Sequence, residues 1–203
     1  MIENKSGIIR SLTKLKVEIM DIQTVYQKTI LYAAEKHGEQ KIPGSNIPYI
    51  VHVSNVCMEI IFAAARTPGF DLELALQAAL LHDVLEDTPV TEAELEAEFG
   101  ARVTAGVKAL SKNSTLPKSG QLDDSLQRIR QQPPEIWAVK LADRITNLQP
   151  PPTNWPPEKI KQYRLDAIRI HETLKDANGY LAERLSKEIE RYAINILCLT
   201  AQK

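Results

Sequence analysis

Apolar residues recur along this chain at three- and four-residue steps, and this spacing predicts α-helices nearly everywhere. The clearest early case, over 20–37, has six apolar positions on one helical face: Ile22, Val25, Tyr26, Ile30, Ala33 and Ala34. The sequence lacks the apolar–polar alternation of strands, and Gly and Pro fall between the periodic blocks. The pattern therefore predicts an all-α protein.

Capping residues and helix breakers set the expected helix boundaries. Asp71 has the side chain of an N-cap for a helix over 71–87, which ends before Pro89. Thr91 begins a capping box, and Gly100 predicts a helix stop. Further helices are expected from Pro48 to Thr67 and over 101–110, 123–131, 134–148, 158–174 and 179–200. Loops are expected at 38–48 and 111–121, and the proline-rich run at 149–158 should be stiff and extended.

Length and composition indicate one domain. With 203 residues, 43% of them hydrophobic, the chain can form a single core of about eight or nine helices over 20–203, preceded by a weakly helical N-terminal extension at 1–19. A net charge of −1 argues against nucleic acid or a membrane surface as partner, and no apolar stretch reaches the length of a membrane span. Both cysteines lie in apolar runs, which favours buried thiols and a cytoplasmic protein.

The segment AALLHDVLED at 78–87 places four ionisable residues in an apolar helix: His82, Asp83, Glu86 and Asp87. Burying an unpaired carboxylate costs on the order of several kcal/mol, so a cation should compensate. On a continuous helix, residues three and four apart share a face, which would group these side chains. A solvated helix end would explain Glu86 and Asp87. It explains His82 and Asp83 poorly, because they directly follow Ala-Ala-Leu-Leu.

A second apolar helix carries polar side chains in the same way. The segment WAVKLADRITNL at 137–148 contains Lys140, Asp143, Arg144 and Asn147. Ordinary pairs within the helix, such as Lys140 with Asp143, are worth a few tenths of a kcal/mol and would also explain the pattern. Alone, this segment supports a site and an ordinary surface equally.

A histidine near Pro48 adds to this picture. A lone histidine such as His52 is more often a packed core residue than a ligand. Together with His82, Asp83 and Asp143 it makes a set of two imidazoles and two carboxylates, which suits Mn²⁺, Fe²⁺ or another borderline divalent ion. Four protein ligands on a six-coordinate ion leave room for water and substrate, and water bound there is acidified.

The order His, His-Asp, Asp resembles the HD superfamily of metal-dependent phosphohydrolases. Six segments are similar to the alarmone-hydrolase domain of RelA/SpoT-type proteins, above all to its small stand-alone members: AAEKHGEQ, PYIVH, AALLHDVLEDT, FGARV, LSKNSTLP and VKLADRITNL. The resemblance covers roughly 22–174. It implies a single-domain HD-fold helical bundle that removes the 3′-pyrophosphate of ppGpp or pppGpp, giving GDP or GTP and pyrophosphate.

The resemblance also implies roles for individual residues. One Mn²⁺, or another divalent ion, would be held by His52, His82, Asp83 and Asp143. The acidic pair that positions or deprotonates the attacking water would be Glu86 and Asp87. The small-molecule nucleotide substrate would be contacted, or its site supported, by Tyr49, Lys41, Lys140, Arg144 and Asn147.

Several basic and aromatic residues outside these motifs are weaker candidates. Tyr163 would either stack on or hydrogen-bond to the ligand, or pack in the core. Lys112, Lys118, Lys159 and Arg164 lie in loops or helix ends that could face the site, although a solvated surface charge explains each of them as well. His37 and His171 are expected to be bystanders near the site or at the surface.

The sequence departs from the family pattern at two places, one in the loop at 38–48 and one directly after His52. The usual basic residue near position 42 is replaced by Ile42, with Lys41 as a substitute one position earlier, and the usual Pro after the ligand histidine is Val53. The altered loop at Ile42 and Pro43 motivates one alternative, a different substrate, and a second alternative of another class stays open beside it. The same site would hydrolyse an adenine alarmone or a phosphorylated nicotinamide dinucleotide (NADPH-like), or the helical module would bind nucleotides without turnover. The acidic pair argues against the second alternative, because a binder needs no water-activating doublet.

Overall fold

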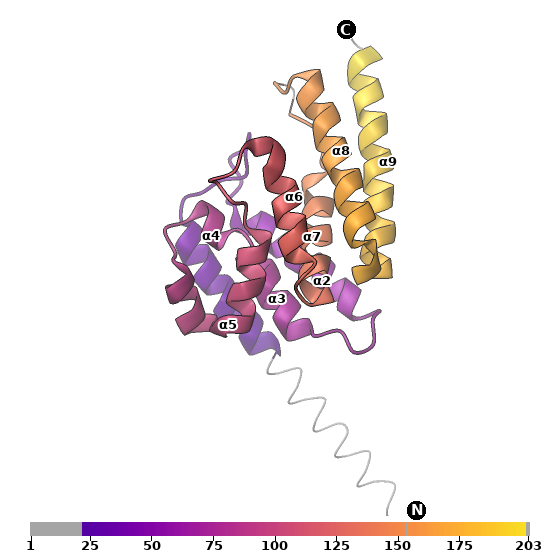
Figure 1. Ribbon diagram of the computed structural model, residues 1–203. Helices are drawn as coiled ribbons and strands as arrows, with labels where there is room; N and C mark the ends of the chain where they lie inside the picture. The colour runs from indigo at the N-terminus through magenta and orange to yellow at the C-terminus, as the bar shows by residue number, and fades with distance from the viewer. Residues whose placement is uncertain (1–21, 153, 202–203) are drawn as a thin grey trace, which may run out of the picture.

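The computed structural model describes residues 22–152 and 154–201, with side chains described to residue 194. Within this part, residues 22–37 form a helix, and the later elements follow in the order α2 (Ile50–Ala64), α3 (Leu72–Leu81), α4 (Val84–Asp87), α5 (Glu92–Leu110), α6 (Lys118–Ile129), α7 (Pro134–Asn147), α8 (Pro157–Leu174), the 3₁₀ turn η1 (Lys175–Ala177) and α9 (Gly179–Ala201). Helices without strands confirm the all-α prediction for these residues (Figure 1). The expected extension at 1–19 lies outside them.

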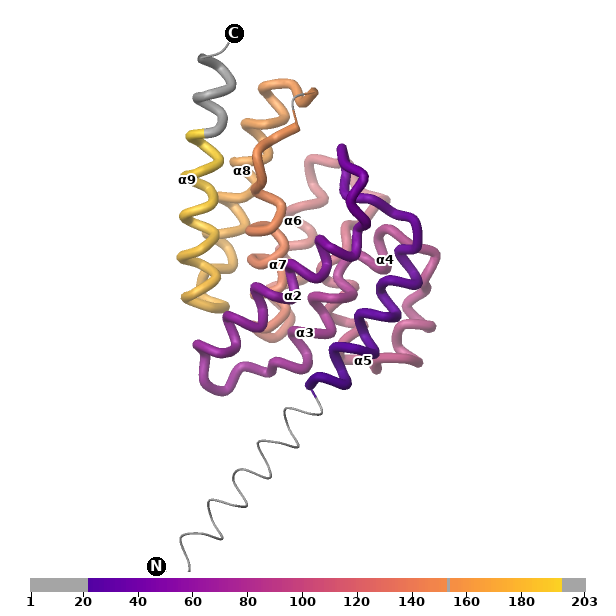
Figure 2. The backbone as a smooth tube through the Cα atoms, turned by 180° about the vertical axis from the view of Figure 1, so that it is seen from behind, coloured from indigo at the N-terminus to yellow at the C-terminus, as the bar shows by residue number. Residues whose placement is uncertain are grey.

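Helices α2, α3 and α7 form the middle of the bundle. Helix α3 packs against α2, α5 and α7, and α8 pairs with α9 along one side (Figure 1). The helix at 22–37 lies on the other side, beside α5 (Figure 2). There Tyr32 meets Phe99 edge-to-face with ring centroids 5.0 Å apart, and Lys36 pairs with Glu94 at 2.8 Å. Fully buried aliphatic side chains from α2, α3 and α7 fill the space between the layers: Ile60, Leu76, Leu80, Leu81, Ile136 and Leu141.

The capping signals in the sequence are confirmed. The Asp71 carboxylate accepts from the amide of Leu74 at 3.1 Å, so it caps α3, and the Thr91 hydroxyl accepts from the amide of Glu94 at 3.2 Å, so it caps α5. Gly100 breaks α5 into two helical stretches with φ 81° and ψ 162°. Glycine adopts this positive φ without the strain that a Cβ would cause.

The prediction of one continuous helix over 71–87 is wrong. Helix α3 ends at Leu81, and a new one-turn helix, α4, begins after Asp83. The ring nitrogen Nδ1 of His82 lies 2.8 Å from the carbonyl of Ala79, which in a continuous helix would accept from the amide of Asp83. A side chain that takes up a backbone carbonyl in this way competes with the helix ladder. The break therefore falls at the His-Asp doublet itself.

Other boundaries also differ from expectation. Helix α6 begins at Lys118, inside the predicted loop, because Pro117 provides an extended N-cap with φ −54° and ψ 143°. The residues that follow Pro117 include poor helix formers, so the sequence does not indicate this start. Helix α2 runs from Ile50 to Ala64 and is shorter than predicted at both ends. In the proline-rich run, Trp155 donates its amide to the carbonyl of Pro152 at 3.0 Å, so this part turns where a stiff extended run was expected.

Two further observations bear on the predicted class of protein. Every helix in the described residues is too short or too polar to cross a lipid bilayer.

Cys57 is a free, buried thiol, and burial raises its pKa to about 12. The side chain of Cys198 lies outside the described part.

An ion pair joins α2 to α9 and yields a stability prediction. Glu59 is 5% exposed, and its carboxylate lies 2.5 Å from the guanidinium of Arg184. Arg184→Met leaves this buried carboxylate unpaired, so we expect a loss of about 2–3 kcal/mol in the free energy of unfolding. That is below the cost for a fully buried pair, because the Arg184 side chain is 36% exposed.

Chemical denaturation measures the effect, with Arg191→Met as the matched control on the same helix. Arg191 pairs with Glu188 at 2.7 Å, and its side chain is 67% exposed. The control should therefore cost less than about 1 kcal/mol. Equal losses in the two variants would contradict the role of the α2–α9 ion pair.

Candidate active site

Three separate segments bring the four expected metal ligands together. His52 comes from α2, Asp143 from α7, and the His82–Asp83 doublet from the break between α3 and α4. The Nε2 atom of His82 lies 2.9 Å from Asp83 Oδ2 and 3.7 Å from Asp143 Oδ1. The Nε2 atom of His52 lies 3.5 Å from the same Asp143 oxygen. Ligand atoms of the two histidines and Asp83 all lie within 4.8 Å of one another.

The imidazoles are oriented so that Nε2 faces the carboxylates. In His82, the contact of Nδ1 with the Ala79 carbonyl assigns the proton to Nδ1 in the neutral ring and leaves the Nε2 lone pair toward the cluster. In the neutral rings neither buried Nε2 atom has a hydrogen-bond donor among the described residues, because the atoms that face it are carboxylate oxygens. Buried polar atoms of this kind are rare and need an explanation. Two nitrogen donors facing two carboxylates fit a divalent metal ion.

The charged groups of this cluster shift the pKa values of one another. Burial alone would lower the pKa of His82, but the carboxylates of Asp83 and Asp143 outweigh it and raise the pKa to about 9. Burial would raise the pKa of Asp83, and the His82 charge holds it below its ordinary value instead. Lys140 and the two imidazoles overcome burial and lower the pKa of Asp143. Both carboxylates thus remain charged in a largely apolar setting, which favours a bound cation.

Neighbouring side chains fix the two carboxylates. Lys140 Nζ lies 3.1 Å from Asp143 Oδ2, and the amide of Asn147 donates to Oδ1 of the same residue. The Tyr49 hydroxyl donates to Asp83 Oδ2. Burial and these carboxylates raise the pKa of Tyr49, so its hydroxyl keeps its proton. Three of the expected substrate-site residues therefore contact the carboxylates of the expected metal ligands directly.

The acidic pair lies on α4, directly after the doublet. The amides of Glu86 and Asp87 donate to the carbonyl of Asp83 at 3.1 and 2.8 Å, so one carbonyl anchors both. Glu86 accepts from the backbone amide of Lys112 at 3.0 Å and from its Nζ at 2.5 Å. Asp87 accepts from Gln40 Nε2 at 2.8 Å. Both carboxylates are exposed, so water reaches them.

Two residues that support Asp87 were not predicted to do so: Gln40 was given no role, and His37 was expected to be a bystander. Gln40 bridges Asp87 to the buried His37, whose Nδ1 lies 2.7 Å from Gln40 Oε1. The spacing of His37 and Gln40 within AAEKHGEQ was the available signal. His171 instead pairs with Glu172 at 3.2 Å on α8, so the two histidines do not share one role.

Not every expected substrate residue reaches the cluster. Lys41 is exposed and forms an isolated bridge with Pro48, and its Nζ lies 3.5 Å from Asn46 Oδ1. Tyr163 packs beneath Arg144, whose guanidinium carbon lies 4.5 Å from the ring centroid. Lys159 lies over the ring of Trp155 at 3.9 Å.

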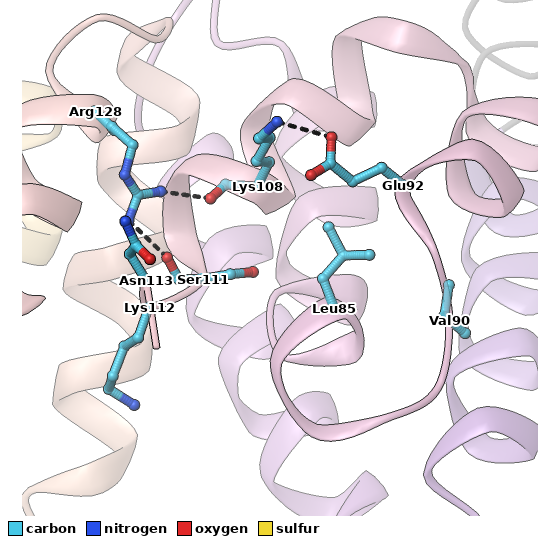
Figure 3. Close-up of a pocket in the computed structure, with 8 residues that line it drawn as sticks. All are labelled: Leu85, Val90, Glu92, Lys108, Ser111, Lys112, Asn113 and Arg128. Atoms are coloured by element: carbon cyan, nitrogen blue, oxygen red, sulfur yellow. Dashed lines mark hydrogen bonds and ion pairs between the residues drawn. The ribbon is translucent and has the colours of Figure 1, made fainter. Parts of the chain in front are cut away.

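Two pockets flank the loop that carries Lys112. One of about 130 Å³ lies beside the four expected metal ligands, since Lys140 contacts Asp143, and it is lined by Lys112, Lys118, Gln121, Leu122, Ser125, Lys140, Arg144 and Asp166. The other, of about 460 Å³, is lined by residues of α4, α5 and this loop, together with Arg128 of α6 (Figure 3). There Lys108 pairs with Glu92 at 2.8 Å, and Arg128 donates to backbone carbonyls, while the Lys112 side chain points away from both. Because Lys108 and Arg128 are already bound to protein groups, the larger pocket has few free charged groups with which to bind a ligand.

Comparison with known proteins agrees with this geometry. Residues 30–180 match the HD domain family. The chain is 34% identical over 173 residues to guanosine-3′,5′-bis(diphosphate) 3′-pyrophosphohydrolase MESH1 of Mus musculus, covering 81% of this chain and 93% of that protein. It is 31% identical over 182 residues to the guanosine-3′,5′-bis(diphosphate) 3′-pyrophosphohydrolase of Aquifex aeolicus, covering 87% of this chain and 24% of that protein.

Solved structures give the same result. A structure described as a metazoan ortholog of SpoT that hydrolyzes ppGpp superposes with a TM-score of 0.73 at 29% identity, covering 82% of this chain and 94% of the other. A Listeria monocytogenes protein at 23% identity, with a TM-score of 0.56 over 71% of this chain and 97% of its own, shares the fold. The resemblance drawn from the sequence motifs is therefore confirmed. The chain belongs to the HD domain family and is related within it to the SpoT-type 3′-pyrophosphohydrolases.

Proposed function

We propose that this protein removes the 3′-pyrophosphate of ppGpp or pppGpp, with Mn²⁺ as the resident metal. One observation carries the proposal. Two buried histidine nitrogens without a hydrogen-bond donor face two charged carboxylates, and an exposed acidic pair is anchored to the carbonyl of one of these ligands. The relatives from Mus musculus and Aquifex aeolicus are named guanosine-3′,5′-bis(diphosphate) 3′-pyrophosphohydrolases, which supports the choice of substrate.

His52, His82, Asp83 and Asp143 would hold the ion, which when bound acidifies water and neutralises charge on the phosphoryl group. Glu86 and Asp87 orient the attacking water and accept its proton. The bond from phosphorus to the ribose O3′ breaks as the bond from water oxygen to phosphorus forms. Pyrophosphate leaves carrying the oxygen atom that came from water. The ribose O3′ stays on the nucleotide and takes up a proton from solvent.

The surrounding residues keep the charges in place during this step. Tyr49 and Asn147 hold the ligand carboxylates by hydrogen bonds, and Lys140 offsets the charge of Asp143. These donors are fixed before substrate arrives, so little reorganisation is needed as charge develops. Lys41, on the loop that also supplies Gln40, would approach the substrate from the solvent side.

We also infer that the catalytic domain spans 20–203 and that the protein is cytoplasmic. The HD match at 30–180 lies inside these bounds and supports them. The net charge of −1 favours a nucleotide held in a local basic pocket over nucleic acid or a membrane surface as partner.

The proposal predicts metal-dependent release of pyrophosphate from ppGpp. Protein stripped of metal and reloaded with Mn²⁺, Fe²⁺, Zn²⁺ or Mg²⁺ is assayed for pyrophosphate, with metal content measured on the same sample. We expect Mn²⁺ to give the highest activity. The panel also contains ppApp, NADPH and, as a control without a 3′-phosphate, GTP. Faster turnover of ppApp or NADPH than of ppGpp would assign a different substrate, and binding without turnover would indicate a sensing module.

A further inference from the structure

The two acids of α4 are held in different ways. Both oxygens of Glu86 accept from Lys112, one from its backbone amide at 3.0 Å and the other from Nζ at 2.5 Å. Asp87 is held through Oδ2, which accepts from Gln40 Nε2 at 2.8 Å. The Asp87 side chain is exposed, so without this bond its carboxylate would turn freely among rotamers. The direction of Asp87 therefore depends on Gln40.

The backbone of Gln40 is fixed, but its side-chain amide needs a further constraint. The backbone amide of Gln40 donates to the carbonyl of His37, and its carbonyl accepts from the amide of Tyr49, both at 2.9 Å. Gly38, with φ 50°, ends the helix that carries His37 and turns the chain toward Gln40. A glutamine amide has an oxygen on one side and an NH₂ group on the other, and either can face a neighbour. The fixed backbone alone does not decide which of the two faces Asp87.

His37 supplies this constraint from a buried position. It is 6% exposed, its ring centroid lies 4.9 Å from that of Tyr49, and its Nδ1 atom lies 2.7 Å from Gln40 Oε1. An amide oxygen only accepts hydrogen bonds, so Nδ1 carries the proton and donates it. The reversed amide would instead place Oε1 against the Asp87 carboxylate, with two acceptors in contact. His37 and Asp87 together thus allow one orientation of the Gln40 amide.

The second ring nitrogen of His37 agrees with this assignment. Its Nε2 atom is buried and has no hydrogen-bond partner among the residues that the structure describes. A proton on Nε2 would be a buried donor without an acceptor, which is costly. With the proton on Nδ1, the single donor of the neutral ring is satisfied and only a lone pair is left without a partner. The hydrogen bonds therefore run in one direction, from His37 through Gln40 to Asp87.

We propose that His37, protonated at Nδ1, is a positioning residue for hydrolysis, because it fixes the Gln40 amide that holds Asp87. Gln40 occupies Oδ2 of Asp87, and the other oxygen, Oδ1, is left to orient the attacking water and accept its proton. The inference rests on the proposed function and adds two residues to its machinery. His37 acts through Gln40, and Gln40 acts through Asp87, so both are positioning residues.

A double-mutant cycle on the Mn²⁺-loaded protein tests this chain of contacts, with ppGpp as substrate. Gln40→Met removes the bond to a charged carboxylate, so kcat should fall about 10- to 100-fold. His37→Phe keeps a ring but removes the donor to a neutral amide, so the loss should be about 3- to 10-fold. KM and metal content should change less than about twofold in both variants, since the contact is with the acid and not with the substrate or ion. Adding His37→Phe to Gln40→Met should lower kcat less than about twofold further.

Two other variants separate positioning from packing. His37→Asn places an amide N–H where Nδ1 stood, so it should recover most of the kcat that His37→Phe loses. His171→Phe is the matched control, because Nδ1 of His171 contacts Glu172 at 3.2 Å on α8, away from the acidic pair. It should leave kcat unchanged. Equal losses in His37→Phe and His37→Asn, or the same His37→Phe loss in the wild-type and Gln40→Met backgrounds, would overturn the inference.

A measurement independent of turnover keeps the result decisive. Nitrogen-15 NMR at about pH 8, where an ordinary histidine is neutral, reports which ring nitrogen of His37 is protonated. The protein is loaded with Zn²⁺, because Mn²⁺ is paramagnetic and broadens nearby signals, and His37→Asn assigns the resonances. We expect a protonated Nδ1, and a proton on Nε2 would overturn the inference even if His37→Phe failed to fold. If ppGpp is left untouched while Nδ1 is protonated, the proposed function fails and the hold of His37 and Gln40 on Asp87 stands.

Discussion

Asp83→Asn should remove bound metal and activity together. The substitution keeps the size of the side chain but removes the charge that opposes His82, whose Nε2 lies 2.9 Å from Asp83 Oδ2. Changing a partner of a metal ligand typically costs 10- to 100-fold in affinity or activity, so we expect loss of a ligand to exceed about 100-fold. Metal content after gel filtration and pyrophosphate release from ppGpp are measured on one preparation.

Asp123→Asn serves as the matched control, because it makes the same chemical change on α6 away from the cluster. Asp123 pairs with Arg169 at 2.7 Å, and both side chains are exposed. Metal content and turnover should match the wild type in this variant. If Asp83→Asn kept a full complement of metal and normal turnover, the assignment of the centre would be wrong.

Glu86→Gln should separate chemistry from metal binding. The amide still accepts from the backbone N–H of Lys112, so the local geometry is retained, but it no longer accepts a proton from water. We expect kcat to fall about 10²- to 10⁴-fold, the usual contribution of a general base, with KM and metal content little changed. Asp87→Asn is measured in parallel to show how the two acids share the role.

The control for this change is Glu92→Gln, an exposed glutamate that pairs with Lys108 at 2.8 Å on α5. It should leave kcat unaltered. A loss of metal in Glu86→Gln would assign this carboxylate to the ion and not to the water. Full activity in both acid variants would remove the acidic pair from the mechanism.

Sequence periodicity predicted most of the fold because each helix buries one continuous apolar face. Helix α7 matches its predicted range almost fully, since Pro134 starts it and an unbroken apolar stripe follows. The break at His82 was not predictable in this way. It depends on one ring nitrogen competing for the carbonyl of Ala79, and that contact leaves no mark on the hydrophobic pattern.

The candidate site was predictable where its chemistry conflicts with its surroundings. Charged groups in apolar helices identified the residues at 52, 82, 83 and 143, which the fold then gathers. Gln40 and Lys112 gave a weaker signal, because each is an ordinary polar residue in a loop. They contact Asp87 and Glu86 across 47 and 26 positions of the chain, and such pairings arise only from the tertiary arrangement.

The shared carbonyl of Asp83 has a consequence for how the site responds to its ion. Because that carbonyl anchors the amides of both acids, any rotation of the Asp83 backbone turns α4 as a unit. If a bound ion shifted the Asp83 backbone, the two neighbouring acids would shift with it, because both amides donate to the same carbonyl. The expected metal ligand Asp83 and the acidic pair are thus joined through a single peptide group.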